Sequence, residues 1–299
     1  MSVQNWIKYM QNPKTLFRAL GAKGYLNFIP DSIYLRILYK LSTGKTLNLN
    51  NPKGFNEKLQ WLKLNDRNPN YTKMVDKYEV RSIISEKIGE EYLFPLLGVW
   101  DSPEAISWEE LPNKFVLKCT HGSGTNIICQ DKNKLNITQA SEQLNKWLRV
   151  NWYWFGREWP YKNVKPRIIA EKFMIDDECG ELRDYKIYTF MGKARIALIA
   201  TERSSGNMKA DYFDKDFNHL CIKWGHPNAD VCPQKPYNYE RMFEIAEILA
   251  AGTRELRVDF FEVNKRLYVG ELTFFDGSGL EFIEPPEWED KLGSWTDLS

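Results

Sequence analysis

Two carboxylates lie inside apolar strands near the end of the sequence, in the stretch RVDFFEVNKRLYVGELTF. A turn near Asn264 would place Asp259 and Glu271 on neighbouring strands, with their side chains on the same face. Buried carboxylates are costly unless they bind a cation, and hard oxygen ligands beside a phosphate suit Mg²⁺. Arg257 projects from the same strand face as Asp259, so a structural ion pair is the alternative to a metal site.

A glycine-bearing hairpin is predicted for residues 114–132, KFVLKCTHGSGTNIICQDK, which read as strand, turn and strand. The stretch is not a Walker loop, because no Gly-Lys-Ser or Gly-Lys-Thr sequence follows and the next segment is a strand. Lys118 ends the first strand, where its ammonium can meet phosphate oxygens while the backbone N–H groups of residues 122–124 close over them. The alternative is a surface hairpin with a solvated lysine.

Two further pairs of charged residues occur on predicted strands. Glu171 and Lys172 end the apolar strand IIAEKFM, and Asp184 and Lys186 alternate onto one face of LRDYKIY. Such residues can line a cleft, although strand ends that reach solvent are the commoner explanation. The three histidines have no metal-ligand spacing, and no Ser–His–Asp or Cys–His combination indicates a covalent nucleophile.

The elements that would position these residues change type along the chain. Apolar residues at helical spacing extend from the N-terminus to about residue 89, and a short strand is predicted at 90–100. Beyond residue 114 the predicted strands fall at 114–132, 166–174, 182–203 and 256–275, separated by helices at 138–152 and 237–253. The halves of 182–203 and of 256–275 are predicted to pair. Helices followed by largely antiparallel strands indicate an α+β fold.

The order of these parts resembles the ATP-grasp superfamily. Lys77, early in a predicted helix, precedes Lys118 with its HGSG turn, the strand-end pair Glu171–Lys172, the DYK strand, and finally RVD with ELT. The sequence is most similar to the branch typified by teichuronopeptide-biosynthesis proteins, which are found with bacterial surface-polysaccharide genes. The resemblance covers about residues 50–285, and it depends on the order of several motifs rather than on any single one.

The resemblance implies a fold of two α+β lobes that hold ATP between them. It divides the chain into a helical N-terminal region at 1–105, a small lobe with the glycine-rich hairpin at 106–175, and a large lobe with the metal site at 176–299. ATP-grasp enzymes usually activate a carboxylate as an acyl-phosphate before an amine attacks it. The resemblance therefore implies ATP and Mg²⁺ as cofactors.

The resemblance also implies roles for individual residues. Glu171 would accept from the adenine amino group, Asp184 would contact the ribose, and Lys118 and Arg257 would act catalytically on the transferred phosphate and the acyl-phosphate. Thr273 stands where the superfamily commonly has asparagine. The implied magnesium ligands are Asp259, Glu271 and Thr273. The implied nucleotide-binding residues are Lys77, Lys118, His121, Gly122, Ser123, Gly124, Glu171, Lys172, Phe173, Met174, Asp184, Lys186 and Lys209, with Arg203 as an alternative to Lys209.

The function implied is an ATP-dependent ligase that joins a sugar-acid carboxylate, such as a uronic acid, to an amino acid or another amine. The aromatic stretch at 151–163, NWYWFGREWPYKN, can stack on sugar rings while Arg157 holds a carboxylate, or it can form a small core beneath a loop. A glycosyltransferase-like polysaccharide protein is an alternative, although no DxD motif occurs in a suitable strand–loop context. A nucleotide-binding scaffold without catalysis is the third possibility.

Charge and composition limit the location and the partners. The net charge of +1 excludes a globally basic nucleic-acid binder, and five cysteines without a CxxC pair indicate reduced thiols. We expect a cytoplasmic protein, because the sequence shows no signal-peptide core and no apolar run of membrane-spanning length. Residues 1–50 carry seven Lys/Arg against Asp31, with aromatic residues between them. They are expected to contact an anionic membrane or a polyanionic glycan, or to form a helical layer over the lobes.

Overall fold

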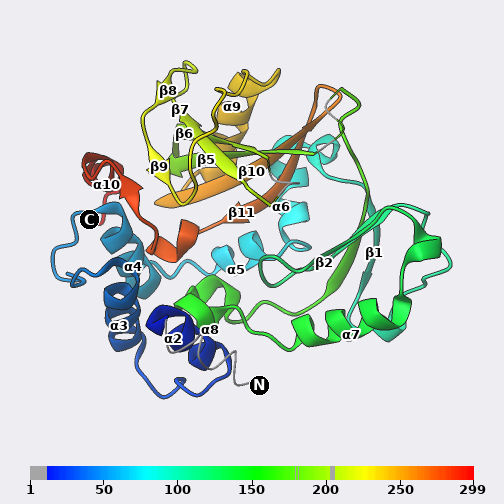
Figure 1. Ribbon diagram of the computed structural model, residues 1–299, viewed down its shortest axis with the longest axis horizontal. Coiled ribbons are helices and arrows are strands. Elements are labelled where there is room, and N and C mark those ends of the chain that lie inside the picture. The colour runs from blue at the N-terminus through cyan, green and yellow to red at the C-terminus, as the bar shows by residue number, and fades with distance from the viewer. Residues whose placement is uncertain (1–11, 179, 181, 203–205) are drawn as a thin grey trace.

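The computed structural model describes residues 12–178, 180, 182–202 and 206–299. Helices combine with two larger antiparallel sheets, as expected for an α+β fold. In Figure 1 the six-stranded sheet lies at the top, the four-stranded sheet lies at the right, and the N-terminal helices lie at the lower left.

The four-stranded sheet has the strand order β1–β4–β2–β3. Its strands are β1 (Leu96–Trp100), β2 (Phe115–Cys119), β3 (Asn126–Cys129) and β4 (Ile168–Lys172). Burial alternates along β2, and its inward residues Phe115 and Leu117 pack with Leu144 of the following helix. The predicted hairpin is confirmed, because the glycine-bearing turn joins β2 to β3. β1 lies within the range 1–105 that was assigned to the helical region, yet it pairs with β4.

The six-stranded sheet has the order β11–β10–β5–β6–β7–β8. Its strands are β5 (Arg183–Phe190), β6 (Lys193–Thr201), β7 (Lys209–Phe213), β8 (His219–Leu220), β10 (Glu255–Val263) and β11 (Arg266–Thr273), and β9 (Lys223–Trp224) pairs separately with β12 (Ile283–Glu284). The predicted hairpins β5–β6 and β10–β11 are confirmed. Both turns, Met191–Gly192 and Asn264–Lys265, have positive φ at both residues, as the turns favoured in two-residue hairpins require.

The helices cover the sheets and connect them. They are α2 (Pro13–Ala22), α3 (Asp31–Thr43), α4 (Phe55–Asn65), α5 (Asn70–Val75), α6 (Val80–Ile88), α7 (Ile137–Leu148), α8 (Tyr153–Gly156), α9 (Tyr239–Ala250) and α10 (Glu287–Ser294). α9 packs on β5, β6 and β10 with its apolar stripe, in which Met242, Ile245 and Leu249 are fully buried.

Helices α4 to α6 belong to the core of the larger lobe. Phe55 of α4 makes edge contacts with Phe190 of β5 and Trp224 of β9, at ring-centroid distances of 5.7 and 5.4 Å. α4 also packs on α10: the Glu289 carboxylate accepts from the Asn56 backbone N–H at 2.8 Å, 233 positions away in sequence. Helix α4 of the predicted N-terminal region therefore packs with strands and a helix from the second half of the chain.

Helices α2 and α3 form a smaller unit beside this core. The inward residues of α3, Tyr34, Leu35 and Leu38, pack with Leu47 and Leu280. Within the described ranges, every helix is too short or too polar to cross a membrane. The aromatic residues Tyr34 and Tyr39 are buried, so part of the basic N-terminal segment does form a helical layer.

Candidate functional site

Two adjoining cavities lie between the two large sheets. One encloses about 440 Å³ and the other about 170 Å³, and both are lined by Lys118, Asn126 and Phe261. The larger of the two is mainly apolar, whereas charged side chains line the smaller one. The site therefore has an apolar end and a charged end, which meet at Lys118.

The charged end is formed by strands β5, β10 and β11. Asp259 and Glu271 are paired across β10 and β11, as predicted, and Lys186 of β5 is paired with Asp259 on its other side. The Lys186 ammonium lies 2.5 Å from Asp259 Oδ2 and 2.7 Å from Asp184 Oδ2. Side chains two apart on a strand share a face, so Asp184 and Lys186 both enter the cavity. Asp184 thus contacts a lysine at the charged end.

Arg257 lies behind the two opposed carboxylates, with its side chain 12% exposed. Its guanidinium donates to both oxygens of Asp259, at 2.6 and 2.8 Å, and to Thr273 Oγ1 at 3.2 Å, and it also pairs with Asp276. Burial opposes its charge, but Asp259 and Asp276 raise the pKa of Arg257 well above its ordinary value. The ion pair considered as the structural alternative is therefore present in the structure.

Lys77 connects the charged end to the hairpin. Its ammonium lies 2.9 Å from Glu271 Oε2 and donates to Gly122 O at 2.7 Å. The prediction that Lys77 lies early in a helix is wrong, because it occupies the turn between α5 and α6. Burial disfavours the charge of Glu271, but Lys77, Arg257 and Lys186 hold the pKa of Glu271 below its usual range. Glu271 is therefore ionised at neutral pH.

Glu171 and Lys118 contact each other where the two ends meet. Lys118 Nζ lies 2.7 Å from Glu171 Oε2, and Arg81 Nη1 lies 3.2 Å from Glu171 Oε1. Arg81 was not among the predicted site residues. It belongs to α6, ninety positions before Glu171, and nothing in the local sequence distinguishes it from a solvated helical arginine. Glu171 is thus held by two cations at the junction of the cavities.

The apolar end carries the side chains expected around a planar base. Val116, Ile128, Leu182 and Phe261 line it. The predicted residues Lys172, which ends β4, and Phe173 and Met174, which follow it, line it as well. Apolar walls with a few convergent polar groups are typical of ligand pockets. Chain segment 172–174 leaves the small sheet here and leads to β5, so it also joins the two lobes.

Of four other residues that were predicted to bind the nucleotide, two line the charged cavity and two lie elsewhere. Ser123 and Gly124 line the charged cavity, whereas His121 is buried with Nε2 at 3.2 Å from Trp147 O of α7. Burial lowers the pKa of His121, which favours the neutral ring. His121 therefore faces the core of the small lobe. Lys209 begins β7, two strands away from β5, and Arg203 lies outside the described residues.

The aromatic stretch at 151–163 forms a small core. The Arg157 side chain is 1% exposed, and its guanidinium lies 4.2 Å from the ring centroid of Tyr34 and 4.5 Å from that of Trp154. Tyr153 is also buried, and its hydroxyl donates to Asp31 at 2.6 Å. The interpretation in which Arg157 holds a substrate carboxylate is therefore wrong, because aromatic rings enclose its charge.

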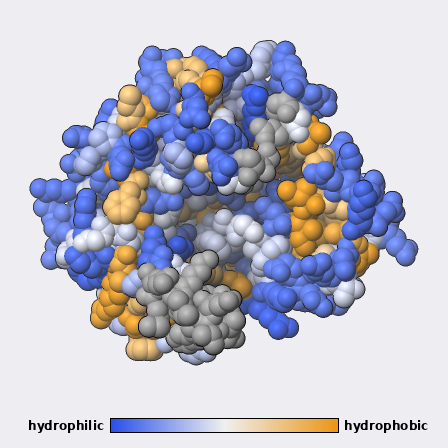
Figure 2. Space-filling model, in the orientation of Figure 1, coloured by the Kyte–Doolittle hydropathy of each residue, from blue (hydrophilic) through white to orange (hydrophobic). Residues whose placement is uncertain are grey.

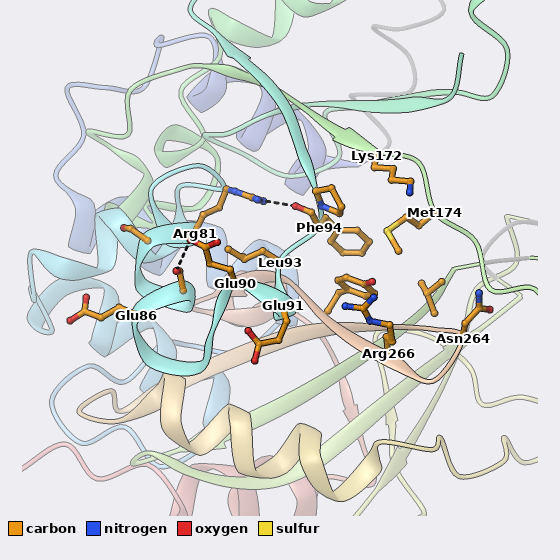
Figure 3. A pocket seen from close by; sticks show the side chains of 15 residues that line it. Arg81, Glu86, Glu90, Glu91, Leu93, Phe94, Lys172, Met174, Asn264 and Arg266 are labelled. Carbon is orange, nitrogen blue, oxygen red and sulfur yellow. Dashed lines mark hydrogen bonds between the residues drawn. The ribbon is translucent and has the colours of Figure 1, made fainter. Parts of the chain in front are cut away.

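A third cavity, of about 940 Å³, is also lined by Lys172 and Met174 of segment 172–174. Figure 3 shows Arg81 in its wall, with its guanidinium directed toward Phe94, and it shows Lys172 and Met174 at the far side. Arg81 Nη2 donates to Phe94 O at 2.8 Å. Arg81 thus extends between this cavity and Glu171 of the interlobe site.

A buried network supports the loop that follows β11, residues 275–279, and sequence analysis missed it. Four of these five residues have positive φ, between 55° and 61°, which is costly for the non-glycine residues among them. Lys63 Nζ donates to Ser278 O at 2.7 Å and to Gly156 O at 2.9 Å, while Gln60 Nε2 donates to Ser278 O at 2.9 Å. Both donors come from α4, so this helix holds the loop beside Arg257.

This network gives a pH-dependent prediction. Burial lowers the pKa of Lys63 to about 7, from 10.5 for an exposed lysine. Between these values the unfolded chain binds a proton that the folded protein lacks, so the free energy of unfolding should rise with pH. Lys63→Met should lose this dependence, and the wild type should gain on the order of 2 kcal/mol relative to it between about pH 7 and pH 9. Urea unfolding of both proteins measures this, with Lys146→Met as an exposed control. Parallel pH profiles of wild type and Lys63→Met would contradict the prediction.

The donor set of the site suits a nucleotide with magnesium. No cluster of three or more acidic, histidine or cysteine side chains forms a metal site among the described residues. Two carboxylates and the Thr273 hydroxyl remain as hard oxygen donors, and magnesium commonly takes few protein ligands and completes its shell with phosphates and water. Lys77, Lys118 and Lys186 border the same cavity, where they could neutralise phosphate oxygens.

Two α+β lobes with a glycine-bearing hairpin, opposed carboxylates on neighbouring strands and an apolar interlobe cavity define an ATP-grasp protein. A family model for TupA-like ATPgrasp proteins matches residues 57–296. The chain belongs to that family, and it has the ATP-grasp fold with additional N-terminal helices. A comparison with curated proteins finds no significant match.

Several solved structures of ligases are similar to this chain. The D-alanine–D-alanine ligase from Helicobacter pylori is 13% identical with a TM-score of 0.47, over 81% of this chain and 69% of that one. The L-amino acid ligase from Bacillus licheniformis is 12% identical with a TM-score of 0.45, over 84% and 57%. The D-alanine–D-alanine ligase from Bacillus anthracis is 16% identical with a TM-score of 0.42, over 67% and 57%. The chain thus spans 57% of the length of each Bacillus ligase.

Proposed function

We propose that this protein is an ATP-dependent carboxylate–amine ligase. The observation that carries the proposal is the charged end of the interlobe site. There Lys77, Lys186 and Arg257 surround the opposed carboxylates Asp259 and Glu271, at contact distances of 2.5 to 3.4 Å. This arrangement places positive charge and hard oxygen ligands around one small cavity, as phosphoryl transfer requires.

Each group of side chains in the site would bind a different part of the nucleotide and its metal ion. The apolar end would hold the base, and Lys118, Lys186 and Lys77 would hold the phosphate oxygens. Asp259 and Glu271, with Thr273, would hold Mg²⁺, which neutralises phosphate charge when bound. Arg257 would orient Asp259 from behind and stabilise negative charge close to it.

The chemistry needs no protein nucleophile. A carboxylate oxygen of the substrate attacks the terminal phosphorus of ATP, which gives an acyl-phosphate and ADP. An amine then attacks the acyl carbon, the C–O bond to phosphate breaks, and the amine loses a proton. The reactive acyl-phosphate must be protected from water, and the tip of the hairpin, with Ser123 and Gly124 lining the cavity, is placed to cover it.

The substrate class is proposed from the family resemblance. We propose a sugar acid, such as a uronic acid, as the carboxylate and an amino acid or another amine as its partner, in the synthesis of a bacterial surface polysaccharide. The resemblance to teichuronopeptide-biosynthesis proteins supports this choice. A cytoplasmic location fits it as well, because ATP is supplied there.

The test is ADP and phosphate release across a matrix of uronic acids and amino acids in the presence of Mg²⁺. We expect release only when an acid and an amine are both present, together with an amide product detected by mass spectrometry. Transfer of sugar from a nucleotide sugar without ATP consumption would favour the glycosyltransferase alternative. Tight ATP binding without turnover on any pair would favour the scaffold.

A further inference from the structure

Helix α3 is apolar on two opposite sides. Its inner side is packed in the N-terminal unit, whereas its outer side exposes Ile33, Ile37 and Leu41, which are 50%, 38% and 39% exposed. These residues are spaced four apart, so they form one row along the helix. Among the residues that the structure describes, none covers this row.

The loop that leads into α3 extends this apolar surface. Tyr25 is 66% exposed and Phe28 is 82% exposed. Scattered apolar residues on a surface are ordinary, but five of the fourteen exposed large apolar side chains among the described residues lie at positions 25–41. Figure 2 shows hydrophobic residues at the lower left, over the region that Figure 1 labels α3. Clustering of this kind marks an interaction surface.

Positive charge accompanies the apolar row. Arg36 and Lys40 lie between its members on the exposed side of the helix, and Lys45 follows the helix. The Arg36 guanidinium donates to Leu47 O at 2.8 Å and the Lys40 ammonium donates to Gly44 O at 2.6 Å, so both charges are held at this surface without an acidic partner among the described residues. Residues 32–50 contain no aspartate or glutamate. Asp31 precedes the row, but its carboxylate accepts from the Tyr153 hydroxyl and pairs with Arg157 on the inner side. The outer surface of α3 is thus apolar and cationic at once.

We propose that this α3 surface, formed by Tyr25, Phe28, Ile33, Arg36, Ile37, Lys40, Leu41 and Lys45, docks on an anionic lipid membrane. The apolar side chains enter the headgroup boundary, and the cations meet lipid phosphates. The observations favour this partner over two others. A second copy would bring two cationic surfaces together, and a polyanionic glycan would leave the isoleucines and Phe28 without an apolar partner. The proposal stands independently of the ligase activity.

The test is co-sedimentation of the full-length protein with phosphatidylcholine vesicles, with and without phosphatidylglycerol. We expect binding only to the anionic vesicles, and weaker binding at about 1 M salt, where the Debye length is about 3 Å. The triple variant Ile33→Ser, Ile37→Ser and Leu41→Ser should bind at least about tenfold more weakly. Arg36→Gln and Lys40→Gln should each cost about fivefold.

Matched controls come from exposed residues on other helices. Ile137→Ser on α7 and Ile248→Ser on α9, both 41% exposed in the wild type, should bind vesicles like the wild type, as should Lys146→Gln. Circular dichroism and thermal unfolding check that each variant is folded. Three outcomes would overturn the proposal: no binding to anionic vesicles by the wild type, equal binding by the folded triple variant, or a dimer that the triple variant dissociates. Binding to a uronic-acid polymer but not to vesicles would overturn it in favour of the glycan.

Discussion

Magnesium-dependent ATP consumption is expected to fall to background when Glu271 is replaced by glutamine. The structure holds the pKa of this carboxyl below its usual range, so Glu271→Gln removes a full negative charge at every working pH. The variant keeps the shape of the side chain but replaces one of the two carboxylate oxygens opposite Asp259 with an amide nitrogen, which cannot bind a cation. We expect a loss of about a hundredfold or more in kcat, measured as ADP release over a range of Mg²⁺ concentrations.

This variant is preferable to Asp259→Asn, because the Glu271 side chain is 28% exposed whereas that of Asp259 is 4% exposed. Both carboxylates neutralise two cations, but removing one partner of a buried ion pair costs about 3–5 kcal/mol, and Asp259 is the more deeply buried. Asp259→Asn should also abolish turnover, but its thermal unfolding must be checked beside its activity. Glu284→Gln, on an exposed residue of β12, is the matched control and should keep full activity. Near-wild-type turnover by a folded Glu271→Gln protein at saturating Mg²⁺ would rule out the metal site proposed here.

Nucleotide affinity is expected to fall about ten- to hundredfold in Lys118→Ala. Charge-assisted hydrogen bonds contribute about 1.5–3 kcal/mol, and Lys118 borders both the apolar and the charged cavity. Isothermal titration calorimetry with ATP and Mg²⁺ measures this loss. Because Lys118 also pairs with Glu171, a folding check by thermal unfolding is needed.

Lys114→Ala is the control for this second prediction. Lys114 is an exposed lysine directly before the same strand, β2, so its loss changes the charge of the lobe without reaching either cavity. Its affinity for ATP should match that of the wild type. If Lys118→Ala binds ATP as tightly as Lys114→Ala does, Lys118 does not contact the phosphates.

The parts of the site that lie on hairpins could be predicted from the sequence. Alternation along each strand and a turn of fixed length determine which side chains share a face. For this reason the opposition of Asp259 and Glu271, and the contact of Arg257 with them, followed from the pattern alone. The prediction of two α+β lobes rested instead on the resemblance of the motif order to the ATP-grasp superfamily. Strand pairing between distant segments has no local signal in the sequence.

The residues that sequence analysis missed or misplaced act across long separations. Arg81 reaches Glu171 from α6, and Lys63 reaches Ser278 across 215 positions. Lys77 was assigned to a helix because its neighbours have helical spacing, whereas its own position is a turn that lets the ammonium contact both Gly122 and Glu271. Local periodicity cannot distinguish such residues from solvated ones, because their roles depend on where other segments fold.

The contact between α4 and α10 affects how the protein can fold as it is synthesised. The backbone N–H of Asn56 in α4 donates to the Glu289 carboxylate of α10. The Lys58 ammonium donates to Thr296 O, which is 238 positions away in the sequence. The apolar surface of α4 therefore leaves the ribosome long before its partners exist. Contacts of such high sequence separation form slowly, and exposed apolar segments are prone to aggregate in the interval. The large lobe should consequently become resistant to protease only after α10 has emerged, when the earliest core helix and the last helix of the chain meet.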